Sequence, residues 1–215
     1  MYEIELKQSS KLINYEEAFE YMQKRVDLIL TKSQKELIWF LDHNHVYTQG
    51  ASSSDKEIKK KINIPILNTN RGGKTTYHGP GQRTVYFMIN LNNRKKDIRK
   101  FISLIENSLI NLLETYNIES TTFKDRVGVW VIKNQGKTLE KEMKIGAIGL
   151  RIKKWITYHG LSFNIKPDLE YYKHIDACGL SEYQNTSLKQ LGINISCDTF
   201  DHEYFVEFKK LLLNF

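Results

Sequence analysis

Residues 71–82 read Arg71-Gly-Gly-Lys-Thr-Thr-Tyr-His-Gly-Pro-Gly-Gln82 and lead into an apolar run over residues 85–91. This segment holds four of the chain's twelve glycines. Glycine adopts positive φ and lets a ligand approach the backbone closely, whereas a surface turn seldom needs so many glycines. The spacing matches neither a P-loop nor a dinucleotide-binding fingerprint. We therefore expect the segment to shape a binding site; the alternative is an elaborate loop that leads into the next strand.

The pattern of apolar residues around this segment predicts a mixed sheet covered by helices. Residues 85–91 are almost continuously apolar, which indicates a strand buried on both faces. Strands dominate the middle of the chain without a regular alternation with helices, so we expect an α/β (α+β) fold and a single domain over residues 1–215. Helices are predicted over residues 14–30, 97–116 and 199–213, with a shorter one after Thr186; further strands over 36–40, 64–67, 127–132, 144–152 and 155–165; and an exposed hairpin loop over 133–142.

Composition and charge are those of an ordinary globular protein. Hydrophobic residues make up 40% of the 215 residues, and no apolar run approaches the roughly 20 residues of a membrane-spanning helix. Residues 1–6 mix acidic with apolar side chains, unlike a secretory signal or a transit peptide. Cys178 and Cys197 are too few for a disulfide framework or a zinc site, which favours a reducing, cytoplasmic compartment. The net charge of +7 indicates an acidic partner or simply a lysine-rich surface, and no basic run interleaved with aromatics indicates a nucleic acid.

Two further segments place glycine inside predicted strands. They read Lys144-Ile-Gly-Ala-Ile-Gly-Leu-Arg-Ile152 and Tyr158-His-Gly-Leu-Ser162. Glycine in a strand interior costs packing and conformational entropy, so it often marks a bulge or a place where a ligand lies against the backbone. We interpret His159, taken alone, as a buried and hydrogen-bonded histidine rather than a catalytic one.

Cys178 is the candidate nucleophile, in the loop sequence Ala177-Cys-Gly179. A free cysteine has a pKa of about 8.5, so only a small fraction is thiolate at neutral pH. A nearby lysine ammonium would favour the thiolate, and the lysine could then exchange protons with the incoming or leaving group. Taken alone, Cys178 and Cys197 both read as ordinary cysteines.

Five motifs in a fixed order resemble those of the octanoyltransferase family, over roughly residues 10–190. They are Arg71-Gly-Gly-x-x-x-Tyr-His-Gly-Pro-Gly-Gln82, Gly128-Val-Trp-Val131, Lys144-Ile-Gly-x-x-Gly-Leu-Arg-Ile152, His159-Gly-Leu-x-x-Asn164 and Cys178-Gly-Leu180. The resemblance implies the fold shared by lipoate-protein ligases and biotin-protein ligases, a mixed sheet flanked by helices. One departure is visible, because residues 134–143 form a longer link between the second and third motifs than is usual in the family.

The resemblance also implies an activity and a set of site residues. The family transfers octanoyl from octanoyl-acyl carrier protein to a lysine of lipoyl domains, which are carried by 2-oxoacid dehydrogenases and the glycine cleavage H protein. This is the first step of protein lipoylation. Cys178 matches the cysteine that carries the acyl thioester, and Lys144 matches the lysine that lowers its pKa. The implied substrate-binding residues are Arg71, Gly72, Gly73, Lys74, Thr75, Thr76, Tyr77, His78, Ala147, Ile148, Gly149, Gly160, Leu161 and Ser162.

The implied mechanism needs neither ATP nor a metal, because the energy of the first thioester is retained in the second. Its partners are proteins, with no nucleic acid or membrane among them. A lipoate-protein ligase is the main alternative, since it shares the fold and a comparable Gly-Gly…Tyr-His segment but activates a free acid with ATP. An amidotransferase that passes lipoyl groups between proteins and a non-catalytic module that binds acyl-carrier or lipoyl domains are further alternatives. The Gly-Pro-Gly-Gln continuation together with Cys178 and Lys144 favours acyl transfer.

Overall fold

The computed structural model describes residues 3–179 and 182–215, apart from the side chain of Cys178. Along the chain the helices and strands are β1 (Ile4–Gln8), α1 (Tyr15–Leu30), β2 (Glu36–Leu41), β3 (Val46–Gln49), η1 (Asp55–Glu57), β4 (Ile66–Asn68), β5 (Thr76–His78), β6 (Gln82–Met88), η2 (Leu91–Asn93), α2 (Ile98–Thr115), β7 (Ile118–Phe123), β8 (Arg126–Asn134), β9 (Lys137–Lys153), β10 (Ile156–Asn164), η3 (Leu169–His174), η4 (Ala177–Gly179), β11 (Gln184–Asn185) and α3 (Cys197–Leu212).

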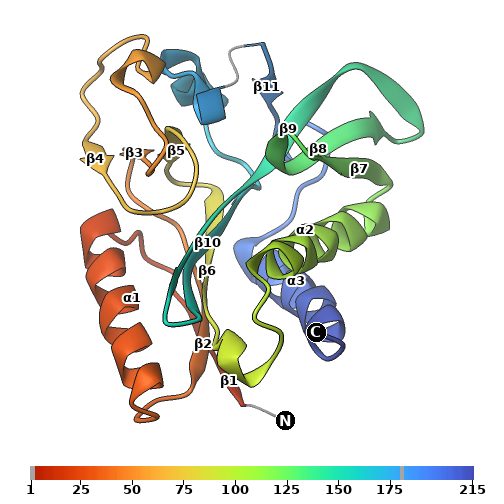
Figure 1. Ribbon diagram of the computed structural model, residues 1–215. Coiled ribbons are helices and arrows are strands. Elements are labelled where there is room, and N and C mark those ends of the chain that lie inside the picture. The colour runs from red at the N-terminus through yellow and green to blue at the C-terminus, as the bar shows by residue number, and fades with distance from the viewer. Residues whose placement is uncertain (1–2, 180–181) are drawn as a thin grey trace.

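A mixed eight-stranded sheet forms the centre of the molecule (Figure 1). Its strand order is β1-β2-β6-β10-β9-β8-β7, and β11 pairs with β9 beside that path. β1 runs parallel to β2 and β11 parallel to β9, whereas the other neighbours are antiparallel. Figure 1 shows α1 on one side of the sheet, α2 and α3 on the other, and a small second sheet of β4, β3 and β5 above α1. The predicted mixed sheet flanked by helices is confirmed.

The apolar face of each helix determines which side of the sheet it covers. In α1, Ala18, Met22, Val26 and Ile29 recur every three or four residues and pack in one cluster with Trp39 of β2. α2 and α3 bury a larger core, rich in leucine and phenylalanine, against the opposite face of the sheet. Among the helices of the described residues, none is long and apolar enough to cross a membrane.

The three long helices and the buried central strand are confirmed. α1, α2 and α3 begin and end within two residues of the predicted ranges. β6 begins three residues before the predicted strand at residues 85–91, and every one of its residues is buried. A strand with helices on both faces of its sheet has no solvent-facing side, which explains its continuous apolar sequence.

The exposed hairpin loop expected over residues 133–142 is wrong in its extent. β8 continues to Asn134 and β9 begins at Lys137, so the turn consists of Gln135 and Gly136 alone, with φ of 49° and 78°. A two-residue turn with positive φ at both positions matches the twist of the flanking strands. Residues 133–142 are polar because they form the end of a long hairpin that extends into solvent. Their composition does not indicate that they pair as strands.

The short helix expected after Thr186 is also wrong. Between β11 and α3 the described residues form turns, and no helix begins there. The backbone amides of this stretch bond to strands of the main sheet instead: Thr186 donates to the Lys144 carbonyl at 2.8 Å and Leu188 to the Asn164 carbonyl at 3.0 Å. Beyond them the chain makes a single turn, closed by the bond from the Leu191 amide to the Ser187 carbonyl at 3.1 Å, and does not continue as a helix.

Gly160 of β10 provides a test of how tightly the sheet is packed. A methyl group at this position would lie 2.0 Å from the Val85 carbonyl oxygen of the neighbouring strand, so one backbone would have to move. We expect Gly160→Ala to lower the free energy of unfolding by about 3 kcal/mol in urea titrations. Gly136→Ala is the matched control, because that glycine has positive φ but no atom within 4 Å of the added group. Its cost should be about 1 kcal/mol, and equal costs at both sites would contradict the account of packing.

Candidate active site

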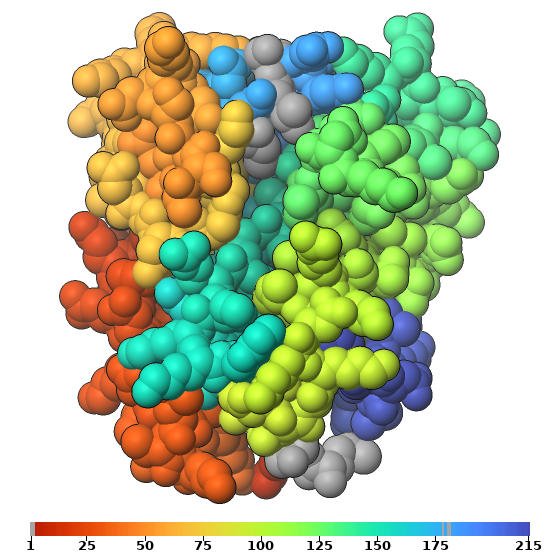
Figure 2. Space-filling model, viewed as in Figure 1, coloured from red at the N-terminus to blue at the C-terminus, as the bar shows by residue number. Residues whose placement is uncertain are grey.

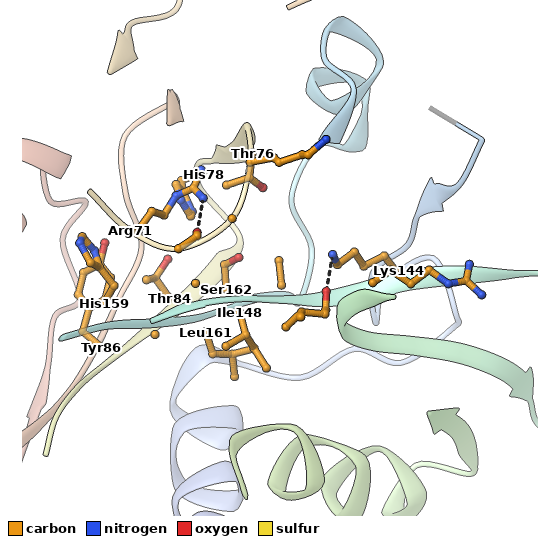
Figure 3. Close-up of a pocket in the computed structure, with 18 of the residues that line it drawn as sticks. Arg71, Thr76, His78, Thr84, Tyr86, Lys144, Ile148, His159, Leu161 and Ser162 are labelled. Carbon is orange, nitrogen blue, oxygen red and sulfur yellow. Dashed lines mark hydrogen bonds between the residues drawn. The ribbon is translucent and has the colours of Figure 1, made fainter. Parts of the chain in front are cut away.

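A pocket of about 210 Å³ lies among the loop that precedes β5, β5 itself, and β8, β9 and β10. In the space-filling view, a recess separates the yellow segment from the green one, and teal side chains lie within it (Figure 2). Figure 3 shows side chains from both sides pointing into this space. All three glycine-bearing segments of the sequence contribute to it, through Arg71, Gly72, Gly73, Lys74, Thr76, His78, Lys144, Ala147, Ile148, Gly149, Gly160, Leu161 and Ser162.

Strand pairing brings the second and third of these segments together. In the antiparallel pair β9–β10, Gly149 lies opposite Gly160, Ile148 opposite Leu161, and Ala147 opposite Ser162. The two predicted substrate-binding stretches are therefore adjacent, residue by residue, on one wall of the pocket. The sequence could not predict this register, because it contains no information on how far each strand slides along its neighbour.

Alternation along β5 divides the first segment between two surfaces. Thr76 and His78 face the pocket. Thr75 and Tyr77 do not line it: the Thr75 amide donates to a Glu57 carboxylate oxygen at 2.8 Å, and Tyr77 packs in a separate aromatic cluster. Successive residues of a strand point to opposite faces, so these two residues support the pocket wall from behind.

The Gly-Pro-Gly turn returns Gln82 to His78, which explains part of the motif. His78 Nδ1 lies 2.7 Å from Gln82 Oε1, while Gln82 Nε2 donates to the Tyr172 hydroxyl at 2.7 Å. Gln82 therefore holds the orientation of the His78 ring. His78 Nε2 is buried and has no hydrogen-bond partner among the residues that the structure describes.

Arg71 is turned toward the backbone of the small sheet. Its Nε donates to Thr48 Oγ1 at 3.0 Å and its Nη2 to the Thr48 carbonyl at 2.6 Å, while Nη1 donates to the Gly72 carbonyl at 3.0 Å. These bonds tie the glycine-rich loop to β3. Arg71 is 7% exposed, so its guanidinium contributes a fixed positive charge beneath the pocket.

Lys144 reaches the pocket through an irregularity in β9. The pairing of β9 with β8 shifts register here, so that Ile145 is an extra residue in a β-bulge, a feature that re-aims neighbouring side chains. Lys144 is 5% exposed, and its Nζ donates to the Val127 carbonyl at 2.9 Å, the dashed line at Lys144 in Figure 3. The same nitrogen lies 5.1 Å from the centroid of the Trp130 ring. The ammonium is thus held in a defined direction with little access to water.

The side chain of Cys178 lies outside the described residues, and its backbone belongs to η4. The next residue, Gly179, faces the glycine-rich loop, and a methyl group there would lie 2.5 Å from Lys74 Nζ. Beyond residues 180 and 181, β11 runs beside β9 with Asn185 opposite Lys144. The Cys178 turn therefore connects two segments that both contact the walls of this pocket. Its role as nucleophile stays a prediction.

His159 agrees with its interpretation as a buried, hydrogen-bonded histidine, although it also lines the pocket. It is 1% exposed, its Nε2 lies 3.0 Å from Asn70 Oδ1, and its Nδ1 lies 3.5 Å from the Tyr15 hydroxyl. The other lining residues carry no sequence signal, since each is an isolated residue of an ordinary type within a helix, strand or turn. They are Tyr15, Thr84, Tyr86, Asp125, Arg126 and Val127.

Three buried histidines lie at or beside the pocket: His78 and His159 line it, and the ring of His43 packs against that of His78. Burial lowers the pKa of His43, which bonds to Tyr86, to about 4. Burial, helped by the positive charge of Arg71, lowers the pKa of His159 to about 3. Burial and the neighbouring His43 place the pKa of His78 well below its ordinary value. At neutral pH all three rings are therefore neutral, and Arg71 is the charged residue beside them.

Known proteins with similar sequences identify the family. Residues 14–209 match the family model described as the lipoyl protein ligase A/B catalytic domain. An octanoyltransferase from Ehrlichia canis (strain Jake) is 44% identical over 213 residues, which covers 99% of this chain and 97% of the relative. An octanoyltransferase from Wolbachia sp. subsp. Brugia malayi (strain TRS) is 45% identical over 204 residues, covering 94% of this chain and 97% of the relative.

Solved structures support the same fold. One is that of an archaeal lipoylation system, a bi-partite lipoate protein ligase and its lipoyl domain from Thermoplasma acidophilum, with a TM-score of 0.68 at 14% identity over 98% of this chain and 84% of that chain. A biotin protein ligase from Aquifex aeolicus has a TM-score of 0.55 at 10% identity, over 100% of this chain and 71% of that chain. Together, the pocket built from three of the five motifs, the family match and the near-full-length relatives show that this chain belongs to the lipoyl protein ligase A/B catalytic-domain family and, within it, to the octanoyltransferases.

Proposed function

We propose that this chain moves an octanoyl group from octanoyl-acyl carrier protein to a lysine of a lipoyl domain, with residues 1–215 acting as one catalytic domain. The observation that carries the proposal is that Lys144 lines the pocket formed by all three glycine-bearing segments, and that Gly179, the neighbour of Cys178, lies against Lys74 of the same lining. The identity of 44–45% to octanoyltransferases over nearly the whole chain supports the same reaction. The acceptors we propose are the lipoyl domains of 2-oxoacid dehydrogenases and the glycine cleavage H protein.

The size and polarity of the pocket suit a medium-length acyl chain. A cavity of about 150 Å³ accommodates benzene. The pocket of about 210 Å³ therefore has room for an eight-carbon chain. Gly149 and Gly160, which are paired across β9 and β10, leave one wall of the pocket free of side chains, so an acyl chain can lie against the backbone there. The neutral histidines impose no charge on the chain.

In the first half-reaction, the Cys178 thiolate attacks the carbonyl carbon of the octanoyl thioester. A new bond forms between the acyl carbon and the Cys178 sulfur, and the bond to the carrier's phosphopantetheine sulfur breaks. That sulfur takes up a proton and leaves as a thiol. The ammonium of Lys144 favours the Cys178 thiolate because an adjacent positive charge stabilises the ionised thiol. Lys144 is also a candidate donor of the proton to the leaving sulfur.

In the second half-reaction, the amine of the lipoyl-domain lysine attacks the Cys178 thioester. An amide bond forms, the bond to the Cys178 sulfur breaks, and the incoming nitrogen loses a proton, which Lys144 can accept after giving up its own. The amide is more stable than the thioester, so this step runs in one direction. The energy of the donor thioester drives both steps, and ATP hydrolysis is not needed.

An assay with matched donors separates acyl transfer from the ATP-dependent ligation that the shared fold also allows. We expect a lipoyl domain to be modified by octanoyl-carrier protein without ATP, and to stay unmodified with free octanoate whether or not ATP is present. The intact mass of the lipoyl domain, measured after each of the two reactions, shows whether it has been modified. Modification that requires free octanoate and ATP would contradict the proposal and favour a ligase.

A further inference from the structure

Glu106 of α2 is a buried carboxylate that the proposed mechanism does not use. It is 8% exposed, and its Oε1 accepts a hydrogen bond of 3.2 Å from the Gly128 amide at the start of β8. Burial raises the pKa of Glu106, while the Gly128 hydrogen bond and the positive charge of Lys144 oppose that rise. A carboxylate removed from water is costly unless hydrogen bonds and opposite charge compensate for the lost hydration. Here both compensating groups come from the catalytic side of the sheet.

A single peptide unit connects Glu106 to Lys144. The Val127 carbonyl oxygen, which accepts from Lys144 Nζ at 2.9 Å, and the Gly128 amide, which donates to Glu106, belong to the same peptide bond. The peptide is trans, so its oxygen and its hydrogen point in opposite directions. An ammonium at the oxygen and a carboxylate at the hydrogen both align with the peptide dipole. Each hydrogen bond is charge-assisted, and each polarises the unit in favour of the other.

The local backbone is built for this contact. Gly128 has φ of +123°, a conformation that side-chain-bearing residues rarely adopt. A methyl group at Gly128 would also lie 2.7 Å from Lys144 Cε and 2.5 Å from the Gly146 carbonyl oxygen. The glycine therefore allows the lysine stem to pass directly over the peptide that receives its ammonium. The bulge at Ile145 supplies the matching irregularity on β9.

We propose that Glu106 is a positioning residue for Lys144: its carboxylate holds the 127–128 peptide, and that peptide directs the Lys144 ammonium toward the Cys178 turn. The inference rests on the proposed function for its catalytic consequence, but the hydrogen-bonded connection itself involves described residues only. A general base or acid is effective when a third group fixes its orientation, and here the third group acts through the backbone rather than by direct contact.

Two substitutions separate the effect of side-chain length from the effect of the negative charge at Glu106. Glu106→Gln keeps an oxygen at the same distance from the Gly128 amide, whereas Glu106→Asp keeps the charge but is one methylene shorter. In a Cys197→Ala background, where Cys178 is the remaining thiol, we expect Glu106→Asp and Glu106→Ala to slow alkylation by iodoacetamide at neutral pH by about tenfold, the effect of losing one charge-assisted hydrogen bond. Glu106→Gln should slow alkylation less than Glu106→Asp, because it keeps the hydrogen bond to the Gly128 amide and loses only the charge of the acceptor. For octanoyl transfer, kcat should fall in the same order while KM stays close to the wild-type value.

Glu36→Gln is the matched control for lost stability. Glu36 is also a buried carboxylate that accepts from a backbone amide, that of Asn90 at 2.8 Å, and it pairs with Arg94 away from the pocket. The Glu36→Gln substitution should lower the melting temperature of the protein without slowing alkylation of Cys178. If Glu106→Ala does not fold, the Asp and Gln variants still decide the question. Wild-type alkylation in Glu106→Asp, or an equal loss in Glu106→Gln and Glu106→Asp, would overturn the inference. Failure of the wild-type protein to transfer octanoyl would instead count against the proposed function.

Discussion

Replacing Cys178 with alanine should reduce octanoyl transfer by on the order of 10⁴-fold or more, the size of effect seen when a covalent nucleophile is removed. The sulfur accepts the acyl group in the first proposed half-reaction and releases it in the second, so both steps depend on it. Initial rates with octanoyl-carrier protein and a lipoyl domain measure the loss. Intact mass should also show that the variant no longer acquires an octanoyl group.

Cys197→Ala is the internal control for this substitution. Cys197 begins α3, away from the pocket, and burial raises the pKa of its thiol, assisted by the negative charge of Asp42. Its thiolate is therefore scarce at neutral pH, and we expect the variant to retain most of the transfer activity. A comparable loss from both substitutions would show that the nucleophile is assigned to the wrong cysteine.

Lys144→Ala should slow alkylation of Cys178 by about tenfold or more at neutral pH, because the pKa of the thiol would return toward its ordinary value and the thiolate fraction would fall. Transfer should fall further still, since the variant also lacks a group to exchange protons with the leaving sulfur and the attacking amine. The rate of iodoacetamide labelling, measured against pH in the Cys197→Ala background, reports the thiolate directly.

Lys144→Arg distinguishes the charge of the lysine from its proton exchange. A guanidinium keeps the positive charge but hardly deprotonates, so alkylation should stay closer to the wild-type rate while transfer remains slow. Cys178 labelling at the same rate in wild type and Lys144→Ala would contradict the electrostatic role. Full transfer activity in Lys144→Arg would contradict the role in proton exchange.

The sequence predicted those parts of the fold in which a long apolar period repeats. α2 is recognisable because its apolar residues return at helical spacing over five turns, and β6 because a strand covered on both faces has no polar positions. Of the small sheet, β4 overlaps the strand predicted over residues 64–67, whereas β3 and β5 escaped prediction, since four and three residues are too few for an alternating pattern to emerge. The hairpin of β8 and β9 was predicted too short, because its solvent-exposed end is polar on both faces.

Within the site, the sequence identified the glycines at which the backbone must stay free of side chains. It missed the residues that reach the site only through the packing of helices on the sheet. The glycines of β9 and β10 stand out because a strand rarely contains them, and pairing places Gly149 opposite Gly160. Glu106 gave no signal, since a glutamate in an amphipathic helix is ordinarily solvated. Its contact with Gly128 depends on where α2 lies against the sheet, which no local pattern encodes.

The central claim is that the acyl group passes through the enzyme itself, and one measurement tests it most directly. The protein is mixed with octanoyl-carrier protein alone, without ATP and without an acceptor, and its mass is recorded before and after hydroxylamine. The account predicts one octanoyl group on the protein, mapped to Cys178, released by hydroxylamine as a thioester, and discharged to an added lipoyl domain as a hydroxylamine-resistant amide. The exchange of one thioester for another is nearly balanced in free energy, so a substantial fraction of the enzyme should be acylated. Modification of the lipoyl domain that depends on ATP and survives the loss of Cys178 would contradict the account.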